Sequence, residues 1–166
     1  ASKNSIDLII IRPPLIYGPN VGANFLKIMD LVYKKIPLPF EGIIKKRSLV
    51  FVGNISDLIY NCIINSSIKN CSLLISDNEL VSSNELMMLI SANFGYKLRL
   101  FKLPLFVLIV FFSIINKKNQ FDRINSSLIV DASHTKRILN WSPPYTLTEG
   151  LKITTNAYIK KINSTN

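Results

Sequence analysis

Two consecutive prolines, Pro13 and Pro14, follow an apolar segment at positions 6–11. This segment is rich in β-branched residues and contains one charged residue, Asp7, a pattern typical of a central strand in a parallel sheet covered on both faces. Because proline has no N–H to donate to a sheet ladder, the chain must leave the sheet here. The turn-forming residues at 17–20 extend this exit into a loop, and open α/β sheets bind ligands at such strand ends.

Helix and strand patterns alternate through the rest of the chain. Asn54 and Asp131 are suited to cap helices, and Ser82 and Thr146 each begin a capping box in which a glutamate follows three residues later. The predicted strands lie at 6–11, 48–52 and 71–76, and the predicted helices at 24–35, 54–63, 86–92, 103–115, 131–139 and 146–162. This alternation predicts an α/β fold.

Composition is that of a globular protein and leaves the meaning of the charge open. With 166 residues, of which 48% are hydrophobic and 18% charged, the chain has the size and content of one ordinary domain. Its formal net charge of +10 indicates either contact with an anionic molecule or lysine clusters that are only solvated surface. The basic residues are dispersed and form no stripe interleaved with aromatic residues, so no nucleic-acid partner is predicted.

The two cysteines, Cys62 and Cys71, lie in apolar surroundings without a Cys-x-x-Cys spacing. They are predicted to be small buried residues of a reducing compartment, the cytoplasm, and they indicate no metal site. No positively charged segment followed by an apolar core stands at the start of the sequence, so no signal peptide is predicted.

The most apolar run, at 103–115, allows two interpretations. A membrane-spanning helix needs roughly 20 apolar residues, so this run is too short to cross a bilayer. Its composition favours a buried helix. The alternative is a helix that lies against a membrane surface with flanking basic residues on the lipid headgroups. These flanking residues are Arg99, Lys102, Lys117 and Lys118.

Four motifs in a fixed order resemble those of one enzyme family. They are RPPLIYGPNVGANFLKIM at 12–29, RSLVFVGNISDLI at 47–59, SLLISDNELVSSNELMMLIS at 72–91 and VDASHTKRILNWSPPYTLTEGL at 130–151. On these motifs the chain is identified as a member of the NAD-dependent epimerase/dehydratase family, within the extended short-chain dehydrogenases/reductases. It most resembles UDP-glucose or UDP-N-acetylhexosamine 4-epimerases, and only 98–119 is weakly covered.

The resemblance implies that residues 1–166 are the C-terminal, substrate-binding portion of a Rossmann-like enzyme whose N-terminal, cofactor-binding portion is absent. In the family, NAD takes hydride from a sugar carbon and returns it, while the nucleotide diphosphate anchors the substrate. The implied function is therefore binding of a nucleotide sugar, with a UDP-sugar expected, in surface polysaccharide or sugar-nucleotide metabolism. Peripheral membrane contact and a homodimer of the full-length form remain open.

The family's loop at the nicotinamide end of NAD matches Pro13, Pro14 and Tyr17 of this chain. Proline shape and backbone carbonyls are the expected contributors, and Tyr17 is equally suited to packing. Leu15 stands where many members carry an asparagine that touches substrate. Because leucine cannot make that hydrogen bond, the identity of the sugar is left open.

Substrate-binding positions of the family match Asn24, Leu38, Phe40, Arg47 and Arg123. Asn24 and Arg47 match diphosphate contacts, because helix-end amides and a guanidinium both suit phosphate oxygens. An ordinary N-cap and a surface arginine are the alternatives for these two residues. Leu38 and Phe40 belong to a stretch whose backbone passes the uracil ring, although Phe40 is equally suited to the core. Arg123 resembles an arginine near the nucleotide ribose.

Two motifs that the family's chemistry requires are absent from this sequence. None of the six glycines forms the Gly-x-Gly-x-x-Gly fingerprint, and no tyrosine is followed four residues later by lysine. No catalytic residue is therefore assigned, and the chain alone is expected to bind no NAD and to turn over no sugar. It is also expected to be poorly soluble, because its first strand would leave a sheet edge open. The alternatives are a non-catalytic nucleotide-sugar- or phosphate-binding module and a membrane-surface accessory protein.

Overall fold

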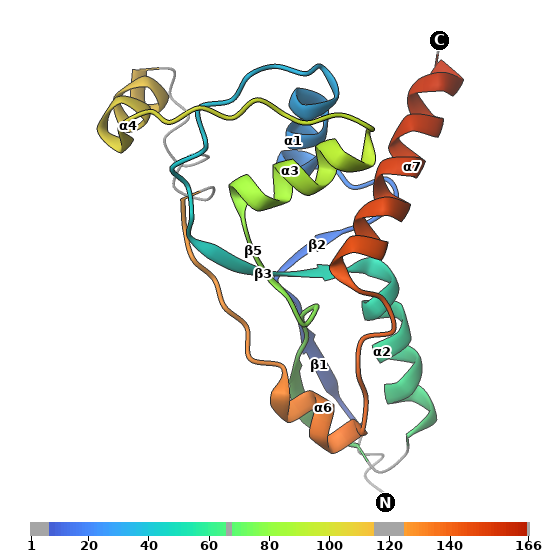
Figure 1. The fold of residues 1–166 in the computed structure, drawn as a ribbon. Helices are drawn as coiled ribbons and strands as arrows, with labels where there is room; N and C mark the ends of the chain where they lie inside the picture. Colours follow the sequence, from blue (N-terminus) through green and yellow to red (C-terminus); the bar gives the residue numbers. More distant parts are fainter. Residues whose placement is uncertain (1–6, 66–67, 115–124, 166) are drawn as a thin grey trace, which may run out of the picture.

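The structure is a computed structural model that describes residues 7–65, 68–114 and 125–165. The fold is α/β, as the sequence predicts (Figure 1). The strands are β1 (Ile9–Arg12), β2 (Leu15–Tyr17), β3 (Lys46–Phe51), β4 (Cys71–Leu74) and β5 (Leu80–Ser82). The helices are α1 (Ala23–Tyr33), α2 (Val52–Ile64), α3 (Ser83–Asn93), α4 (Leu105–Ile114), α6 (Ser133–Leu139) and α7 (Leu147–Thr165).

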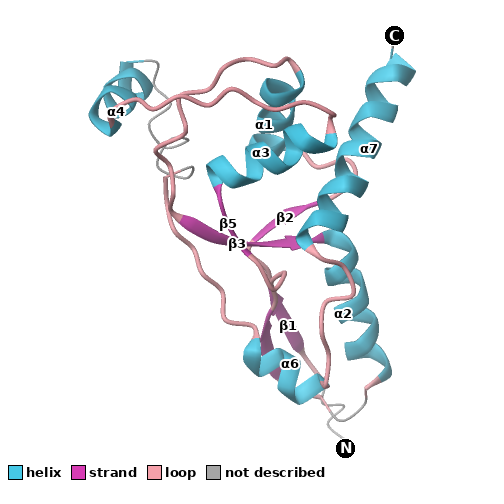
Figure 2. Cartoon of the chain, in the orientation of Figure 1, coloured by secondary structure: helices cyan, strands magenta, loops and turns pink. Residues whose placement is uncertain are grey.

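The strands form two small sheets (Figure 2). In the first, β1 pairs in parallel with β4. In the second, β3 lies in the middle, parallel to β2 and antiparallel to β5. Pro13 and Pro14 separate β1 from β2. The predicted exit from the first sheet is therefore confirmed, but the chain enters a second sheet at once. The short strands β2 and β5 were not predicted from the sequence.

The first strand begins later than predicted and is paired along one edge. Within the described residues, β1 pairs only with β4. The Ile10 side chain, on the less covered face of this short sheet, is 42% exposed. A parallel strand of this apolar composition is normally flanked on both sides. Among the described residues, one edge of β1 is therefore unpaired.

Two clusters of buried side chains hold the elements together. The larger cluster joins α1, α3 and α7 to the three-stranded sheet through residues such as Met29, Leu49 and Leu151. The smaller cluster packs Leu58 of α2 against the first sheet and Trp141. Figure 1 shows the same division, with α1, α3 and α7 around β2, β3 and β5, and with α2 and α6 beside β1. The helices α1, α2, α3 and α7 therefore each bury apolar side chains against a sheet or a neighbouring helix, which is the condition for stable layers.

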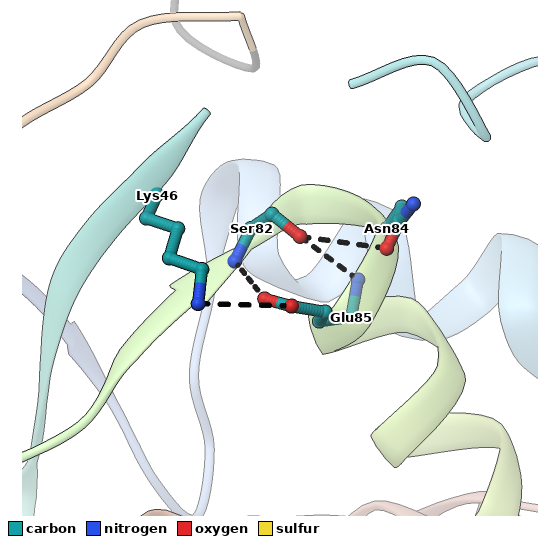
Figure 3. A network of polar contacts seen from close by, with 4 residues as sticks. All are labelled: Lys46, Ser82, Asn84 and Glu85. Carbon is teal, nitrogen blue, oxygen red and sulfur yellow. Dashed lines mark hydrogen bonds and ion pairs between the residues drawn. The ribbon is translucent and has the colours of Figure 1, made fainter. Parts of the chain in front are cut away.

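Both predicted capping boxes are present. The Ser82 N–H donates to Glu85 Oε2 over 2.8 Å, and the Glu85 N–H donates to Ser82 Oγ over 3.3 Å (Figure 3). Lys46 Nζ lies 4.0 Å from the same carboxylate, and this exposed ion pair adds little stability. Thr146 and Glu149 exchange the corresponding bonds over 2.9 Å and 3.2 Å. Helices α3 and α7 therefore begin directly after the predicted cap residues, although α3 starts at Ser83, three residues before its predicted bound.

The prediction that Asn54 caps a helix is wrong. Helix α2 begins at Val52, so Asn54 lies inside its first turn, fully buried. The cap alternative for Asn24 is wrong as well, because Gly22 is the N-cap of α1. The Asn54 side chain instead bonds Asp77 and the Tyr145 backbone, far away in the sequence.

The cap predicted at Asp131 is one residue too early. Ala132 is the N-cap of α6 and has no side-chain cap, and the carboxylate of Asp131, the residue before it, accepts the Ser133 N–H over 2.9 Å. Cys62 is buried, Cys71 is half-buried, and both are free thiols. The cysteines thus behave as small apolar residues.

The prediction of a buried helix at 103–115 is wrong. In α4, Phe106, Val110 and Ile114 are 68%, 54% and 78% exposed, whereas Leu108 is 2% exposed. The helix packs through one side and lies at the edge of the molecule (Figure 1). An apolar sequence indicates that burial of its side chains is favourable, but it does not show that residues of the same chain bury them. Among the described residues, no helix is long and apolar enough to cross a membrane.

Candidate functional site

The loop between β2 and α1 is shaped by Gly18. Its φ is +155°, a conformation that L side chains rarely adopt, and a Cβ there would stand 2.4 Å from Val52 Cγ1. The Gly18 carbonyl accepts the Val21 N–H over 3.1 Å, which closes a turn. This position therefore requires glycine, and the turn sets the direction in which the chain enters α1.

Tyr17, the last residue of β2, is 1% exposed. Its ring lies 5.7 Å from the Phe25 ring in a stacked arrangement and 5.6 Å from the Phe51 ring. Its hydroxyl donates to Asp77 Oδ2 over 2.7 Å. Burial, and then the Asp77 carboxylate, raise the pKa of the Tyr17 hydroxyl. The packing role of Tyr17 is therefore present in the structure, and its cofactor contact stays a prediction.

Asp77 is a buried carboxylate surrounded by donors from three elements. Besides Tyr17 of β2, it accepts the Phe51 N–H of β3 over 3.1 Å and Asn54 Nδ2–H of α2 over 2.6 Å. Burial raises the pKa of the Asp77 carboxyl, and the three hydrogen bonds act in the opposite direction. Asn54 also exchanges two hydrogen bonds of 2.9 Å with the Tyr145 backbone. The carboxylate therefore fixes β2, β3, α2 and the segment before α7 relative to one another.

Asn24 lies in the first turn of α1, half-buried. Within the described part of the chain, no hydrogen bond occupies its side chain, and the α1 N-terminus has neither a side-chain cap nor an acidic residue in its first turn. A helix end of this kind has unpaired N–H groups and a partial positive charge, which favour an anion. A small hollow beside the preceding loop is lined by Asn20 and by Lys161 of α7.

Leu38 and Phe40 are each 5% exposed and belong to the larger core cluster. The Leu38 N–H donates to the Arg99 carbonyl, and the Leu38 carbonyl accepts the Phe101 N–H, each over 3.1 Å. The Phe40 carbonyl accepts the Ile43 N–H over 3.1 Å. These side chains are therefore core residues, and the Leu38 N–H is engaged inside the chain. Contact of this stretch with a uracil ring stays a prediction. It would have to use backbone groups of 37–40 other than those of Leu38, which bond residues 99 and 101.

Arg47 lies near the start of β3, half-buried, and its Nη2 donates to the Ser126 carbonyl over 3.2 Å. Burial lowers the pKa of its guanidinium. The β2–β3 ladder pairs Leu15 with Leu49, so Pro13 and Arg47 each stand two positions before the same pair. Arg123 lies outside the described residues.

The structure thus groups only some of the predicted site residues. Pro13, Pro14 and Arg47 lead into one end of the β2–β3 pair, whereas Asn24 follows the other end of β2. No direct hydrogen bond between described residues links Asn24 to Arg47. Asp77, which the sequence did not single out, joins β2, which follows Pro13 and Pro14, to β3, which carries Arg47.

The residues of this chain do not form a complete site for NAD. Its glycines lie far apart in the sequence, at 18, 22, 42, 53, 95 and 150, so no glycine-rich turn faces a helix N-terminus as a pyrophosphate site requires. Across the described ranges, no group of three or more His, Cys, Asp or Glu residues could hold a metal ion. The chain can therefore contribute to a cofactor site only at its border.

Comparison with known proteins decides the family. No protein-family model matches the chain. The chain is 40% identical over 164 residues to a UDP-glucose 4-epimerase of Vibrio cholerae, a match that covers 98% of this chain and 50% of that protein. The chain belongs to the NAD-dependent epimerase/dehydratase family. It spans about half the length of the curated relative that it matches.

Solved structures of UDP-sugar 4-epimerases match the fold of this chain. A UDP-glucose 4-epimerase of Thermotoga maritima with UDP-glucose matches with a TM-score of 0.70 and 20% identity over 95% of this chain and 47% of that one. A UDP-glucuronic acid 4-epimerase of Bacillus cereus with NAD matches with a TM-score of 0.69 and 17% identity over 95% and 46%. The fold is therefore part of an extended short-chain dehydrogenase/reductase fold, as the sequence predicts.

Proposed function

We propose that this chain is the C-terminal, nucleotide-sugar-binding part of an NAD-dependent sugar 4-epimerase and that its substrate is a UDP-sugar. The observation that carries the proposal is the 40% identity, maintained over 98% of the chain, to half of a UDP-glucose 4-epimerase. A match of that extent leaves little of the chain for an unrelated role. The other half of such an enzyme would supply the glycine-rich loop and the Tyr-x-x-x-Lys pair that this sequence does not contain.

The proposed division of labour follows from the residues that are present. The free α1 N-terminus with Asn24, and the guanidinium of Arg47, are both chemically suited to diphosphate oxygens. Binding of the nucleotide at a distance from the reacting carbon holds the sugar against the cofactor and supplies orientation. NAD, held mainly by the other half, would supply hydride removal and return. Pro13 and Pro14, directly after the end of β1, would line the nicotinamide end.

Complementation tests this proposal. The chain is co-expressed with the cofactor-binding half of the Vibrio cholerae relative, and interconversion of UDP-glucose and its 4-epimer is measured with added NAD. We expect activity from the pair and none from either half. Arg47→Gln in the same pair should raise KM for the UDP-sugar with a smaller change in kcat, because its proposed contact is remote from the reacting carbon. A stable pair that neither binds UDP nor turns over a UDP-sugar would contradict the proposal.

The same experiment separates the alternative. UDP binding by the chain alone, measured by calorimetry, with no activity in the complemented pair, would indicate a non-catalytic binding module. Sedimentation velocity of the complemented pair tests whether two copies associate in the complete enzyme. A coding sequence upstream of Ala1 that contains an in-frame glycine-rich strand–loop–helix and Tyr-x-x-x-Lys would support the epimerase directly.

A further inference from the structure

Helix α4 presents a continuous apolar stripe to solvent. Phe106, Val110 and Ile114 follow one another at intervals of four residues, so they lie on one face of the helix, and all three are more than half exposed. The helix contains no charged residue between Leu105 and Ile114. Leu108 anchors it in the larger core cluster from the other side. The stripe therefore lies opposite the side through which the helix packs.

The segments next to α4 carry further exposed apolar and basic side chains. Residues 38–41 run along 99–102, joined by bridges between Leu38 and Leu100 and between Phe40 and Lys102. We define the α4 surface as the stripe together with exposed neighbours on these segments and on the turn that follows. These neighbours are Ile44 and Phe101, which are 73% and 44% exposed, and the exposed Lys45, Arg99 and Lys102, with Glu41 as the acidic residue among them. Lys46 is not included, because it pairs with Glu85.

We propose that the α4 surface docks onto the surface of an anionic lipid bilayer. An exposed apolar patch rimmed by cations is suited to a membrane interface, where apolar side chains enter the headgroup–acyl boundary and lysines remain on the headgroups. The ten residues of α4 extend about 15 Å, half of the roughly 30 Å of a bilayer core, so the helix lies on the membrane and does not cross it. The inference is independent of the proposed function, because it needs no nucleotide.

Charge decides between a bilayer and a second copy of the chain. Two copies that met face to face through the α4 surface would bring their lysines and Arg99 together, and like charges across an interface are unfavourable. An anionic lipid layer neutralises the same residues. The formal net charge of +10 acts in the same direction at longer range.

Vesicle flotation tests the proposal, because aggregated protein sinks whereas vesicle-bound protein floats. The chain is mixed with vesicles of equal parts phosphatidylcholine and phosphatidylglycerol, or of phosphatidylcholine alone. Two glutamate variants are matched for exposure: Ile114→Glu on α4, at a site 78% exposed, and Ile63→Glu on α2, at a site 76% exposed. We expect flotation with the anionic vesicles, less at high salt, and an affinity lowered roughly tenfold by Ile114→Glu but unchanged by Ile63→Glu.

Several outcomes would overturn the proposal. The proposal fails if the chain does not float with anionic vesicles, or if Ile114→Glu and Ile63→Glu lower the affinity for these vesicles equally. A dimer in sedimentation velocity that Ile114→Glu dissociates would assign the surface to a second copy. Loss of flotation when the cofactor-binding half is added would show that this half covers the α4 surface. Failure of complementation leaves the flotation result intact, so the two proposals fail separately.

Discussion

Replacement of Asp77 by alanine should destabilise the fold strongly, although this residue is not assigned to ligand binding. The change removes the acceptor of three buried donors. The Phe51 N–H loses both of its acceptor oxygens, while Tyr17 Oη and Asn54 Nδ2 keep weaker or second partners, the carbonyls of Leu147 at 3.4 Å and Tyr145 at 2.9 Å. A buried donor without an acceptor costs about 1–3 kcal/mol, so one full and two partial losses give about 3–5 kcal/mol.

The measurement is thermal and urea unfolding followed by fluorescence of Trp141, the single tryptophan. For a chain of this size each kcal/mol corresponds to about 2–4 °C, so the Tm of Asp77→Ala should fall by roughly 10 °C. Glu41→Ala, at an exposed carboxylate outside this network, is the control and should have a smaller effect. A Tm of Asp77→Ala within about 2 °C of the unchanged protein would refute the role assigned to the network.

The pH dependence of Asp77→Asn tests the balance between burial and hydrogen bonding. Burial raises the pKa of Asp77 in the folded state above its ordinary value of 3.8, so the folded chain retains this proton more strongly than the unfolded chain. The stability from this group is therefore complete below pH 3.8 and is lost as pH rises through the folded pKa. The difference in free energy of unfolding between the unchanged protein and Asp77→Asn should therefore shrink as pH rises from 3.8 through the folded pKa. An advantage that grows with pH would mean that the three donors outweigh burial.

Three further predictions concern single positions. Gly18→Ala should lower the free energy of unfolding by about 2 kcal/mol or more, because its Cβ would meet Val52. Gly22→Ala, whose Cβ would have no atom within 4 Å, should change it little, and equal urea midpoints for the two variants would contradict the strain at Gly18. Arg47→Gln should weaken UDP binding roughly tenfold in calorimetry with an unchanged circular dichroism spectrum, and unchanged affinity would leave Arg47 a structural role alone. Ser82→Ala should cost about 1 kcal/mol in urea unfolding through the lost cap, and no change would mean that Glu85 alone maintains the helix start.

Features set by near neighbours in the sequence could be predicted, and features set by distant partners could not. The capping boxes at Ser82 and Thr146 depend on residues three apart, and both are present. Asn54 has the local sequence of a cap, but its side chain bonds Asp77 and Tyr145, 23 and 91 positions away. The capping prediction failed because a buried carboxylate offered this amide a stronger partner than the helix end.

The same limit applies to elements whose pattern is short or uniform. Strands β2 and β5 have three residues each, too few for a period of two to be recognised, and the pairing with β3 decides them. In α4 every face is equally apolar, so the sequence could not indicate which side is covered. The family motifs, in contrast, predicted the fold over nearly the whole chain, because four ordered matches constrain the topology as single elements do not.

Asp77 also explains how stability and the proposed site are connected. Its carboxylate bonds β2 through Tyr17 and β3 through Phe51. The strand β2 directly follows the Pro13–Pro14 loop proposed to face NAD, and β3 carries Arg47, proposed to face the diphosphate. Any displacement of one strand against the other would therefore move the two proposed ends of the ligand site apart. A buried carboxylate is a costly way to join two strands, but its two oxygens accept from both strands and from α2 at once, which a single apolar contact cannot do.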